Sequence, residues 1–277
     1  MAKRIFSTVV IWLFIFAVLW FCRTPGAVAL AALISVLTLR ELYRLLTAAG
    51  NAPFARFGML FGALITAAPW LEAHFGWASH ALLPLATIVL AIRILGERDA
   101  SHRVPALVST VFGLVYVALL LQYLVRIATP LPGDTVSADG RILLCIWVVA
   151  VAKFCDSGAF LSGLAFGKHF LAPQISPKKT WEGAIGGVAA AMIVGALVAW
   201  LGRRELGSFL SPARAALLAA PIAIVAIVSD LVESVIKRHA EIKDSGGAIP
   251  GIGGVFDVSD SILLAAPVGY FLLFPGR

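Results

Sequence analysis

The sequence AAPIAIVAIV at residues 219–228 runs directly into SDLVESVIKRHAEIKDSGGAIPGIGGVFDVSD at residues 229–260. The first segment is wholly apolar, whereas the second crowds acids, bases and glycines together. An ionisable group at a membrane boundary costs free energy unless it pairs, binds an ion or meets a ligand. This stretch therefore predicts a membrane-spanning helix that leads into a functional site.

The whole chain has the composition of a membrane protein. Of its 277 residues, 60% are apolar and only 13% are charged, and the mean hydropathy is +0.95. A helix needs roughly 17 to 25 apolar residues to cross the hydrocarbon core. Runs of that length lie at about residues 6–22, 26–47, 56–73, 80–96, 105–127, 141–163, 183–202, 213–232 and 261–275. We therefore expect an all-α, polytopic integral membrane protein with about nine transmembrane helices.

The distribution of polar residues predicts the domain organisation. No stretch is polar and long enough for a soluble domain, so residues 1–277 are expected to form a single membrane domain. The spans within about residues 1–127 carry few charges in their apolar centres. They are assigned a scaffold role, with a surface open to lipid or to a second copy in a homodimer. Catalytic helices and cytoplasmic loops are expected within about residues 141–277.

Basic residues predict the orientation. With a cytoplasmic N-terminus, most lysines and arginines flank the cytoplasmic ends of the spans, as the positive-inside bias requires. We expect a multi-pass protein of a bacterial-type inner or plasma membrane, with the active site facing the cytoplasm. The formal charge of +7 does not indicate nucleic acid, because the basic residues form no single basic face. The lipid bilayer and phosphate groups are the expected partners.

The end of the apolar run carries a candidate metal site. Asp230, Glu233 and Lys237 follow one another at helical spacings of three and four, so one helix face presents two carboxylates and a lysine. Mg²⁺ prefers oxygen ligands and is usually bound by one or two carboxylates and phosphate oxygens. A solvated helix end with a Glu233–Lys237 pair is the alternative. The depth of Asp230 in the apolar run favours a functional role.

A glycine-rich loop follows, with the sequence KDSGGAIPGIGGVFD at residues 243–257. Glycines let consecutive backbone N–H groups approach phosphate oxygens closely. The flanking charged residues are Lys237, Arg238, Lys243, Asp244, Asp257 and Asp260. Together they predict a cradle for a polyphosphate and a metal, with Gly253 and Gly254 in its phosphate-binding part. The alternative is a flexible linker, which favours serine and polar residues over Ile249, Ile252, Val255 and Phe256.

A second polar segment, DSGAFLSGLAFGKHFLAPQISPKKTWEGAIGG, occupies residues 156–187. Ser176 and the proline after it look like the start of a helix. A helix N-terminus beside Lys178 and Lys179 attracts anions, so we interpret this segment as a phosphate clamp, with topology-anchoring lysines as the alternative. Asp156 follows Lys153 by three residues and is either a metal or nucleotide contact or part of a buried ion pair.

These segments together resemble the phosphatidate cytidylyltransferase (CDP-diacylglycerol synthase) family. The resemblance rests on SVIKRHAEIKDSGGAIPGIGGVFDVSD at residues 234–260 and on the upstream blocks DSGAF and SPKKTWEG. Two residues depart from the family pattern inside the frame PGxGGxxDxxD. Ile252 stands where the family has histidine, and Val258 stands where it has arginine. These departures remove a hydrogen-bond donor and a positive charge, which leaves open a change in activity or substrate.

The resemblance implies that CTP and phosphatidate give CDP-diacylglycerol and pyrophosphate, with Mg²⁺ and the option of a second cation. The implied catalytic residues are Asp230, Asp244, Asp257, Lys237 and Lys243, of which Asp230, Asp257 and Asp244 are the metal ligands. The implied substrate- and phosphate-binding residues are Asp156, Ser176, Lys178, Lys179, Arg238, Gly253 and Gly254.

Three other functions remain open from the sequence. The chain could be a CTP-dependent lipid-alcohol kinase or a paralogue that acts on another lipid phosphate. It could be an ion-coupled transporter in which Asp156 and Asp230 line an ion path. It could also be an inactive homologue with a scaffold role. The clustering of charges at one face and the lack of an inverted repeat disfavour the transporter.

Overall fold

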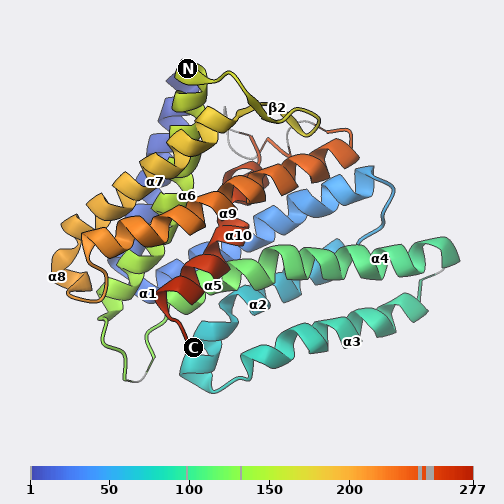
Figure 1. The fold of residues 1–277 in the computed structure, drawn as a ribbon. Coiled ribbons are helices and arrows are strands. Elements are labelled where there is room, and N and C mark those ends of the chain that lie inside the picture. The colour runs from blue at the N-terminus through green and yellow to red at the C-terminus, as the bar shows by residue number, and fades with distance from the viewer. Residues whose placement is uncertain (1, 98, 132, 243–244, 248–252, 277) are drawn as a thin grey trace. The chain divides into compact units, whose positions relative to one another are not determined.

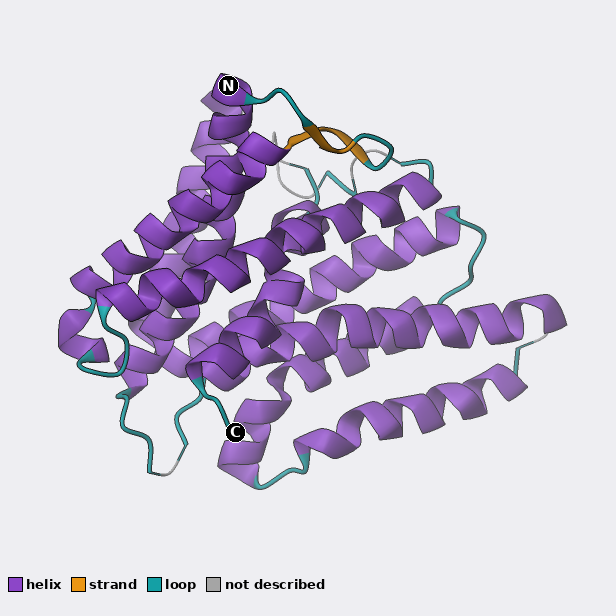
Figure 2. Cartoon of the chain, in the orientation of Figure 1, coloured by secondary structure: helices purple, strands orange, loops and turns teal. Residues whose placement is uncertain are grey.

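The computed structural model describes residues 2–97, 99–131, 133–242, 245–247 and 253–276 (Figure 1), with side chains from residue 13 onward. Its helices are α1 Ala2–Ala48, α2 Ala55–Phe75, α3 Leu82–Leu95, α4 Ala100–Gly113, α5 Leu120–Ala128, α6 Ala138–Phe166, α7 Trp181–Leu201, α8 Arg203–Leu206, α9 Pro212–His239 and α10 Val255–Leu273. A 3₁₀ turn, Ser79–Ala81, precedes α3, and a π-helical segment, Leu114–Leu119, joins α4 to α5. The described residues also form two short antiparallel strands, β1 Phe170–Ala172 and β2 Ser176–Thr180 (Figure 2).

The protein is an all-α polytopic membrane protein, as the apolar runs predict. Within the described residues, six helical segments are long and apolar enough to cross a membrane. They are Leu13–Ala48, Ala100–Ala128, Ala138–Phe166, Trp181–Leu201, Pro212–His239 and Val255–Leu273. The count of nine spans and the cytoplasmic N-terminus stay predictions.

The first two predicted spans lie on either side of a break in α1. Arg23 has non-helical backbone angles of φ 47° and ψ −131° inside this helix. Pro25 follows two residues later. Proline lacks the N–H group and its ring clashes with the carbonyl group four residues before it. The break is therefore a consequence of the sequence RTPG at residues 23–26.

The chain divides into two compact units. The first consists of Met1–Arg126 and Ile236–Ser259, and the second of Ile127–Val235 and Asp260–Arg277. The division passes through α9 and α10. The segment Ile236–Ser259, which the sequence assigns to the catalytic half, thus belongs with the N-terminal helices.

In the first unit, α1 packs on α2 and on α4 around the buried ring of Tyr43. The Tyr43 hydroxyl group donates a hydrogen bond of 2.9 Å to the carbonyl oxygen of Thr110. A Cβ atom at Gly58 or Gly113 would overlap this ring. Glycine at both positions therefore lets three helices meet at one tyrosine.

In the second unit, α6 and α7 pack closely along their length because α7 has a stripe of small residues. The stripe consists of the buried residues Gly183, Gly187, Ala191, Gly195 and Ala199. Small residues let membrane helices approach each other and gain van der Waals contact. The indole N–H group of Trp147 on α6 also donates a hydrogen bond of 3.0 Å to the carbonyl oxygen of Gly195. This packing fixes the helix that carries Lys153 and Asp156.

Candidate active site

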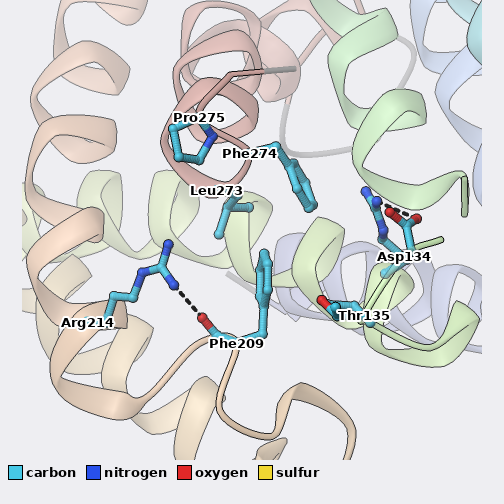
Figure 3. Close-up of a pocket in the computed structure, with 9 residues that line it drawn as sticks. Asp134, Thr135, Phe209, Arg214, Leu273, Phe274 and Pro275 are labelled. Atoms are coloured by element: carbon cyan, nitrogen blue, oxygen red, sulfur yellow. Dashed lines mark hydrogen bonds and ion pairs between the residues drawn. The ribbon is translucent and has the colours of Figure 1, made fainter.

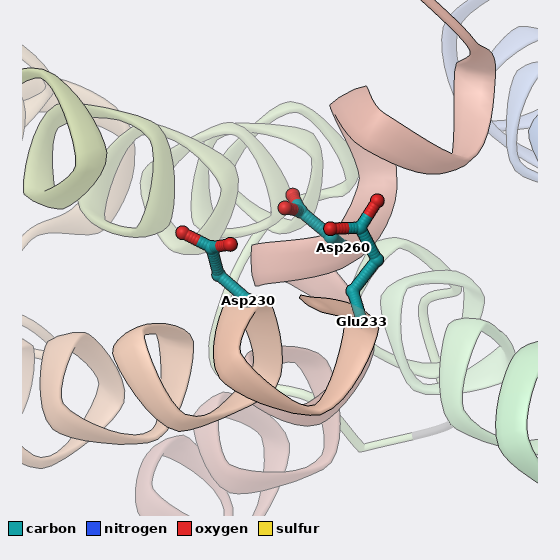
Figure 4. Close-up of side chains that lie close together, drawn as sticks. All are labelled: Asp230, Glu233 and Asp260. Atoms are coloured by element: carbon teal, nitrogen blue, oxygen red, sulfur yellow. The ribbon is translucent and has the colours of Figure 1, made fainter. Parts of the chain in front are cut away.

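Three carboxylates from two helices converge in the second unit (Figure 4). Asp230 and Glu233 lie one turn apart on α9, and Asp260 lies on α10. One oxygen atom from each of the three side chains lies within 4.8 Å of the other two. Glu233 and Asp260 are buried, with 1% and 7% of their surface exposed, and Asp230 is half-buried. We call these three residues the carboxylate cluster.

Two lysines contact the carboxylate cluster. The Nζ atom of Lys179, on β2, lies 2.5 Å from Oδ2 of Asp230. The Nζ atom of Lys153, on α6, lies 3.5 Å from Oδ1 of Asp260 and 3.4 Å from Oδ2 of Asp156. Asp156 thus forms the ion pair with Lys153 that the sequence offers as one of two alternatives, and this pair adjoins the cluster.

Two hydrogen bonds of Ser229 on α9 hold the segment of α10 around Asp260 in place. The hydroxyl group of Ser229 donates to the backbone carbonyl oxygen of Asp260. The same hydroxyl oxygen accepts a hydrogen bond of 3.4 Å from the backbone N–H group of Leu264. Ser229 has no exposed surface. Because a buried hydroxyl group left without a partner is costly, these two bonds hold the helices that carry the cluster in register.

Asp257 contacts Lys237, Ser245 and Gly254, which belong to the first unit. Its Oδ1 atom lies 3.0 Å from Nζ of Lys237. Its Oδ2 atom accepts a hydrogen bond of 2.8 Å from the backbone N–H group of Gly254, just before α10. The backbone N–H group of Ser245 lies within 3.3 Å of Oδ2. A carboxylate at the third helical position that accepts from the N-cap backbone is half of a capping box, so Asp257 ties the glycine loop to the first turn of α10.

Glu41 on α1 contacts two residues of this segment, Ser245 and Phe256. This residue is buried, with 5% of its surface exposed. Its Oε2 atom accepts hydrogen bonds from the hydroxyl group of Ser245 at 2.9 Å and from the backbone N–H group of Phe256 at 2.8 Å. A Cβ atom at Gly246 or Gly254 would overlap the Glu41 carboxylate. Glycine is therefore needed at these two positions so that the backbone can surround a buried acid.

The predicted start of a helix at Ser176 is wrong. Ser176 begins β2, where it pairs with Ala172, and α7 begins at Trp181. Thr180 is the N-cap of α7, since its hydroxyl oxygen accepts a hydrogen bond of 3.1 Å from the backbone N–H group of Gly183. Proline restricts the residue before it to extended conformations. The same Ser-Pro pair that suggests a helix start therefore also suits a strand.

The remaining predicted site residues lie outside the carboxylate cluster or outside the described part of the chain. Lys178 is exposed on β2, and Arg238 is exposed in the last turn of α9. Gly253 has a φ angle of 129°, which favours glycine. The N–H group of Gly254 donates to Asp257. Lys243, Asp244 and Ile252 lie outside the described residues.

The sequence names some of these residues without giving them a final role. Glu233 and Asp260 stand in the predicted metal-binding segments, where they follow Asp230 and Asp257 by three residues, a spacing that places each pair on one helix face. Lys153 is named only as the ion-pair partner of Asp156. Glu41 has no comparable signal, because its partners are more than two hundred residues away in sequence.

The second unit also has a cavity of about 250 Å³ (Figure 3). Its lining residues are Asp134, Thr135, Val136, Arg141, Phe209, Arg214, Leu273, Phe274 and Pro275. Arg141 pairs with Asp134 at 2.5 Å, and Arg214 donates a hydrogen bond of 2.7 Å to the carbonyl oxygen of Phe209. None of the cluster residues lines this cavity. The two arginines stabilise the surrounding loops.

Comparison with known proteins identifies the family. The chain matches the sequence model of the cytidylyltransferase family over residues 2–274. It is 30% identical to the phosphatidate cytidylyltransferase of Synechocystis sp. over 264 residues, which cover 88% of this chain and 87% of the relative. The protein of the same name from Rickettsia bellii is 32% identical over 77% of this chain and 86% of its own length. The one from Pseudomonas aeruginosa is 42% identical, and there the alignment covers 47% of each chain. The chain therefore belongs to the cytidylyltransferase family.

Proposed function

We propose that this protein transfers the cytidylyl group of CTP to phosphatidate, forming CDP-diacylglycerol and pyrophosphate. The observation that carries this proposal is the carboxylate cluster, with Lys153 and Lys179 against it, on membrane-spanning helices of a chain from the cytidylyltransferase family. The relatives named phosphatidate cytidylyltransferase support the choice of substrates.

The reaction needs charge compensation more than it needs a base. A phosphate oxygen of phosphatidate attacks the α-phosphorus of CTP, and the bond from that phosphorus to the oxygen bridging to the β-phosphate breaks. Pyrophosphate leaves with the electron pair of that bond. A phosphate monoester is mostly dianionic near neutral pH, so its oxygen is already a nucleophile. Both reactants are anionic, and positioned cations must offset their repulsion.

The carboxylate cluster has the donor chemistry that suits Mg²⁺. Its three side chains offer oxygen ligands, which this ion prefers. Among the described residues, Asp156 and the cluster together provide four carboxylates, and Lys153 and Lys179 provide two ammonium groups beside them. We therefore propose Asp230, Glu233 and Asp260 as ligands of a divalent cation, and a bound cation would supply positive charge next to the phosphates.

The roles of Asp257 and Asp244 as metal ligands stay predictions. Asp257 pairs with Lys237 in the first unit, and Asp244 lies outside the described residues. We keep Lys178, Lys237, Arg238 and Lys243 as phosphate-binding residues, since basic side chains are the groups that offset the charge of CTP. A second cation and a homodimer also stay predictions.

We further propose that the site faces the cytoplasm from a bacterial inner membrane. The positive-inside bias supports this orientation, and soluble CTP and Mg²⁺ are available on that side. The six candidate spans and the bacterial relatives support the location in a membrane.

The test uses the purified full chain in detergent with phosphatidate, Mg²⁺ and CTP labelled at either the α- or the γ-phosphorus. We expect the α label to enter the lipid and pyrophosphate to form in equal amount. Label from the γ position in the lipid would identify a kinase and overturn the proposal. A panel of other lipid phosphates in the same assay distinguishes phosphatidate from another acceptor.

A further inference from the structure

Lys153 occupies an unusual place for a lysine on a membrane-spanning helix. Its side chain is only 22% exposed, and it lies between two carboxylates from different helices. The Nζ atom also donates a hydrogen bond of 2.7 Å to the hydroxyl group of Ser261 on α10. Lys153 therefore links α6 to α10 directly beside the carboxylate cluster.

The contacts of Lys153 use its full capacity to donate. An ammonium group has three N–H donors, and Lys153 has three acceptors, in Asp156, Asp260 and Ser261. A phosphate could bind to this ammonium group only by displacing one of them. Lys153 is thus suited to hold other side chains in place and poorly suited to bind a substrate phosphate.

The contacts also distinguish the two oxygen atoms of Asp260. Oδ1 accepts from Lys153 at 3.5 Å and from the backbone N–H group of Ser261 at 2.6 Å. Within the described residues, both hydrogen bonds to this carboxylate end on Oδ1, which leaves Oδ2 for a cation. Figure 4 shows the Asp260 carboxylate beside that of Glu233.

We propose that Lys153 is a positioning residue that fixes Oδ1 of Asp260 and so orients this carboxylate toward a divalent cation shared with Asp230 and Glu233. This inference rests on the cation site of the proposed function. It differs from a second role that a buried lysine can have, which is to balance negative charge. Without Lys153, the first role predicts weaker cation binding because Asp260 is no longer held, whereas the second predicts tighter binding because the cluster is more negative.

The experiment measures Mn²⁺ binding to the purified full chain by electron paramagnetic resonance, with Mn²⁺ as the probe for the divalent site. Lys153→Met removes the charge and keeps the length of the side chain. Lys153→Arg keeps the charge and changes the position of the N–H donor groups. The double variant Lys153→Met with Asp156→Asn removes one positive and one negative charge. Its Kd for Mn²⁺ is compared with that of Asp156→Asn alone. Lys168→Met is the matched control, since Lys168 is an exposed lysine of the same unit.

We expect Lys153→Met and Lys153→Arg to raise the Kd for Mn²⁺ by at least about tenfold, as losses of groups that orient metal ligands do. The double variant should bind as weakly as Lys153→Met, and Lys168→Met should bind like the wild type. An unchanged or lower Kd in Lys153→Met or Lys153→Arg would overturn the proposal, as would wild-type affinity in the double variant.

The same measurement separates this inference from the proposed function. Wild-type protein that binds Mn²⁺ but forms no CDP-diacylglycerol would overturn the function and leave the role of Lys153 standing. Wild-type protein that binds no Mn²⁺ would overturn the cation site and, with it, the role of Lys153.

Discussion

Glu41 accepts a hydrogen bond of 2.8 Å from the backbone N–H group of Phe256, across 215 residues of sequence. Phe256 lies in the first turn of α10, where backbone N–H groups lack helical partners and a negative charge is favourable. An acid of the N-terminal helices therefore caps the helix that carries Asp257 and Asp260. The role of the first unit therefore includes holding Ser245 and the start of α10 in place.

Replacing Glu41 tests that role. Glu41→Ala leaves the Phe256 N–H group and the Ser245 hydroxyl group buried without their acceptor, which should cost about 1–3 kcal/mol of stability. Glu41→Gln keeps one acceptor oxygen and should cost less. Thermal unfolding in detergent measures both, with the exposed residue Glu72, as Glu72→Ala, for comparison. Wild-type stability in Glu41→Ala would contradict the capping role.

The carboxylate cluster should be essential for turnover. Asp230→Asn, Glu233→Gln and Asp260→Asn each remove a ligand charge from the proposed cation site. We expect each to lower kcat/KM by at least about a hundredfold, since a metal ion supplies several kcal/mol of charge stabilisation. Formation of CDP-diacylglycerol at saturating Mg²⁺ measures the loss. Asp99→Asn, in the first unit, should behave like the wild type, and full activity in all three cluster variants would place the chemistry elsewhere.

Asp257 should also be essential, through its contacts with Lys237 and the glycine loop. Asp257→Asn is expected to abolish Mg²⁺-dependent turnover while the protein stays folded in membranes. If the two residues act as a pair, the effects of Asp257→Asn and Lys237→Met on kcat/KM should not add in the double variant. Undiminished activity of Asp257→Asn would exclude it from the catalytic residues.

The close packing of α6 on α7 should tolerate no added methyl group at Gly158. A Cβ atom there would lie 2.4 Å from the Cβ atom of Ala190, so Gly158→Ala should force the helices apart. Overpacking of this kind costs typically about 1–3 kcal/mol, and a lower unfolding temperature in detergent would report it. Ala189→Val adds volume at an exposed position of α7 and is the control. Equal unfolding temperatures for the two variants would contradict this packing.

The two departures from the family pattern can be reversed. The double variant Ile252→His with Val258→Arg restores a hydrogen-bond donor and a positive charge within the frame PGxGGxxDxxD, and we expect it to raise turnover with phosphatidate. Initial rates with phosphatidate and with other lipid phosphates measure the change. A fall in the phosphatidate rate would instead indicate that Ile252 and Val258 adapt the site to another substrate.

The features that the sequence predicts depend on residues close together in the chain. The features that it does not predict depend on contacts between residues far apart in the chain. Apolar runs of helical length predict the spanning helices, because length and composition decide whether a helix can cross a membrane. The spacing of Asp230 and Glu233 places both on one face of α9, and their mutual approach follows from local geometry. The acid on α10 that completes the cluster, Asp260, depends on how two helices pack. Sequence spacing alone therefore leaves it among several candidates.

The wrong helix start at Ser176 and the missed role of Glu41 have the same cause, which is contact with residues elsewhere in the chain. Ser176 begins a strand because Ala172 pairs with it, and nothing in the local Ser-Pro pattern distinguishes that outcome from a helix start. From the sequence alone, Glu41 is predicted only to lie on a helix, near the end of a span. Its role depends on Ser245 and Phe256, which the fold brings to it from the far end of the chain.

The small-residue stripe of α7 has a consequence for how this sequence can change. One position in four along the helix, from Gly183 to Ala199, is closed to larger side chains, while exposed residues such as Ile185 and Ile193 can exchange with other apolar types. Relatives can therefore differ at most positions of this helix and keep its packing. Low overall identity is thus compatible with unchanged packing of α7 on α6.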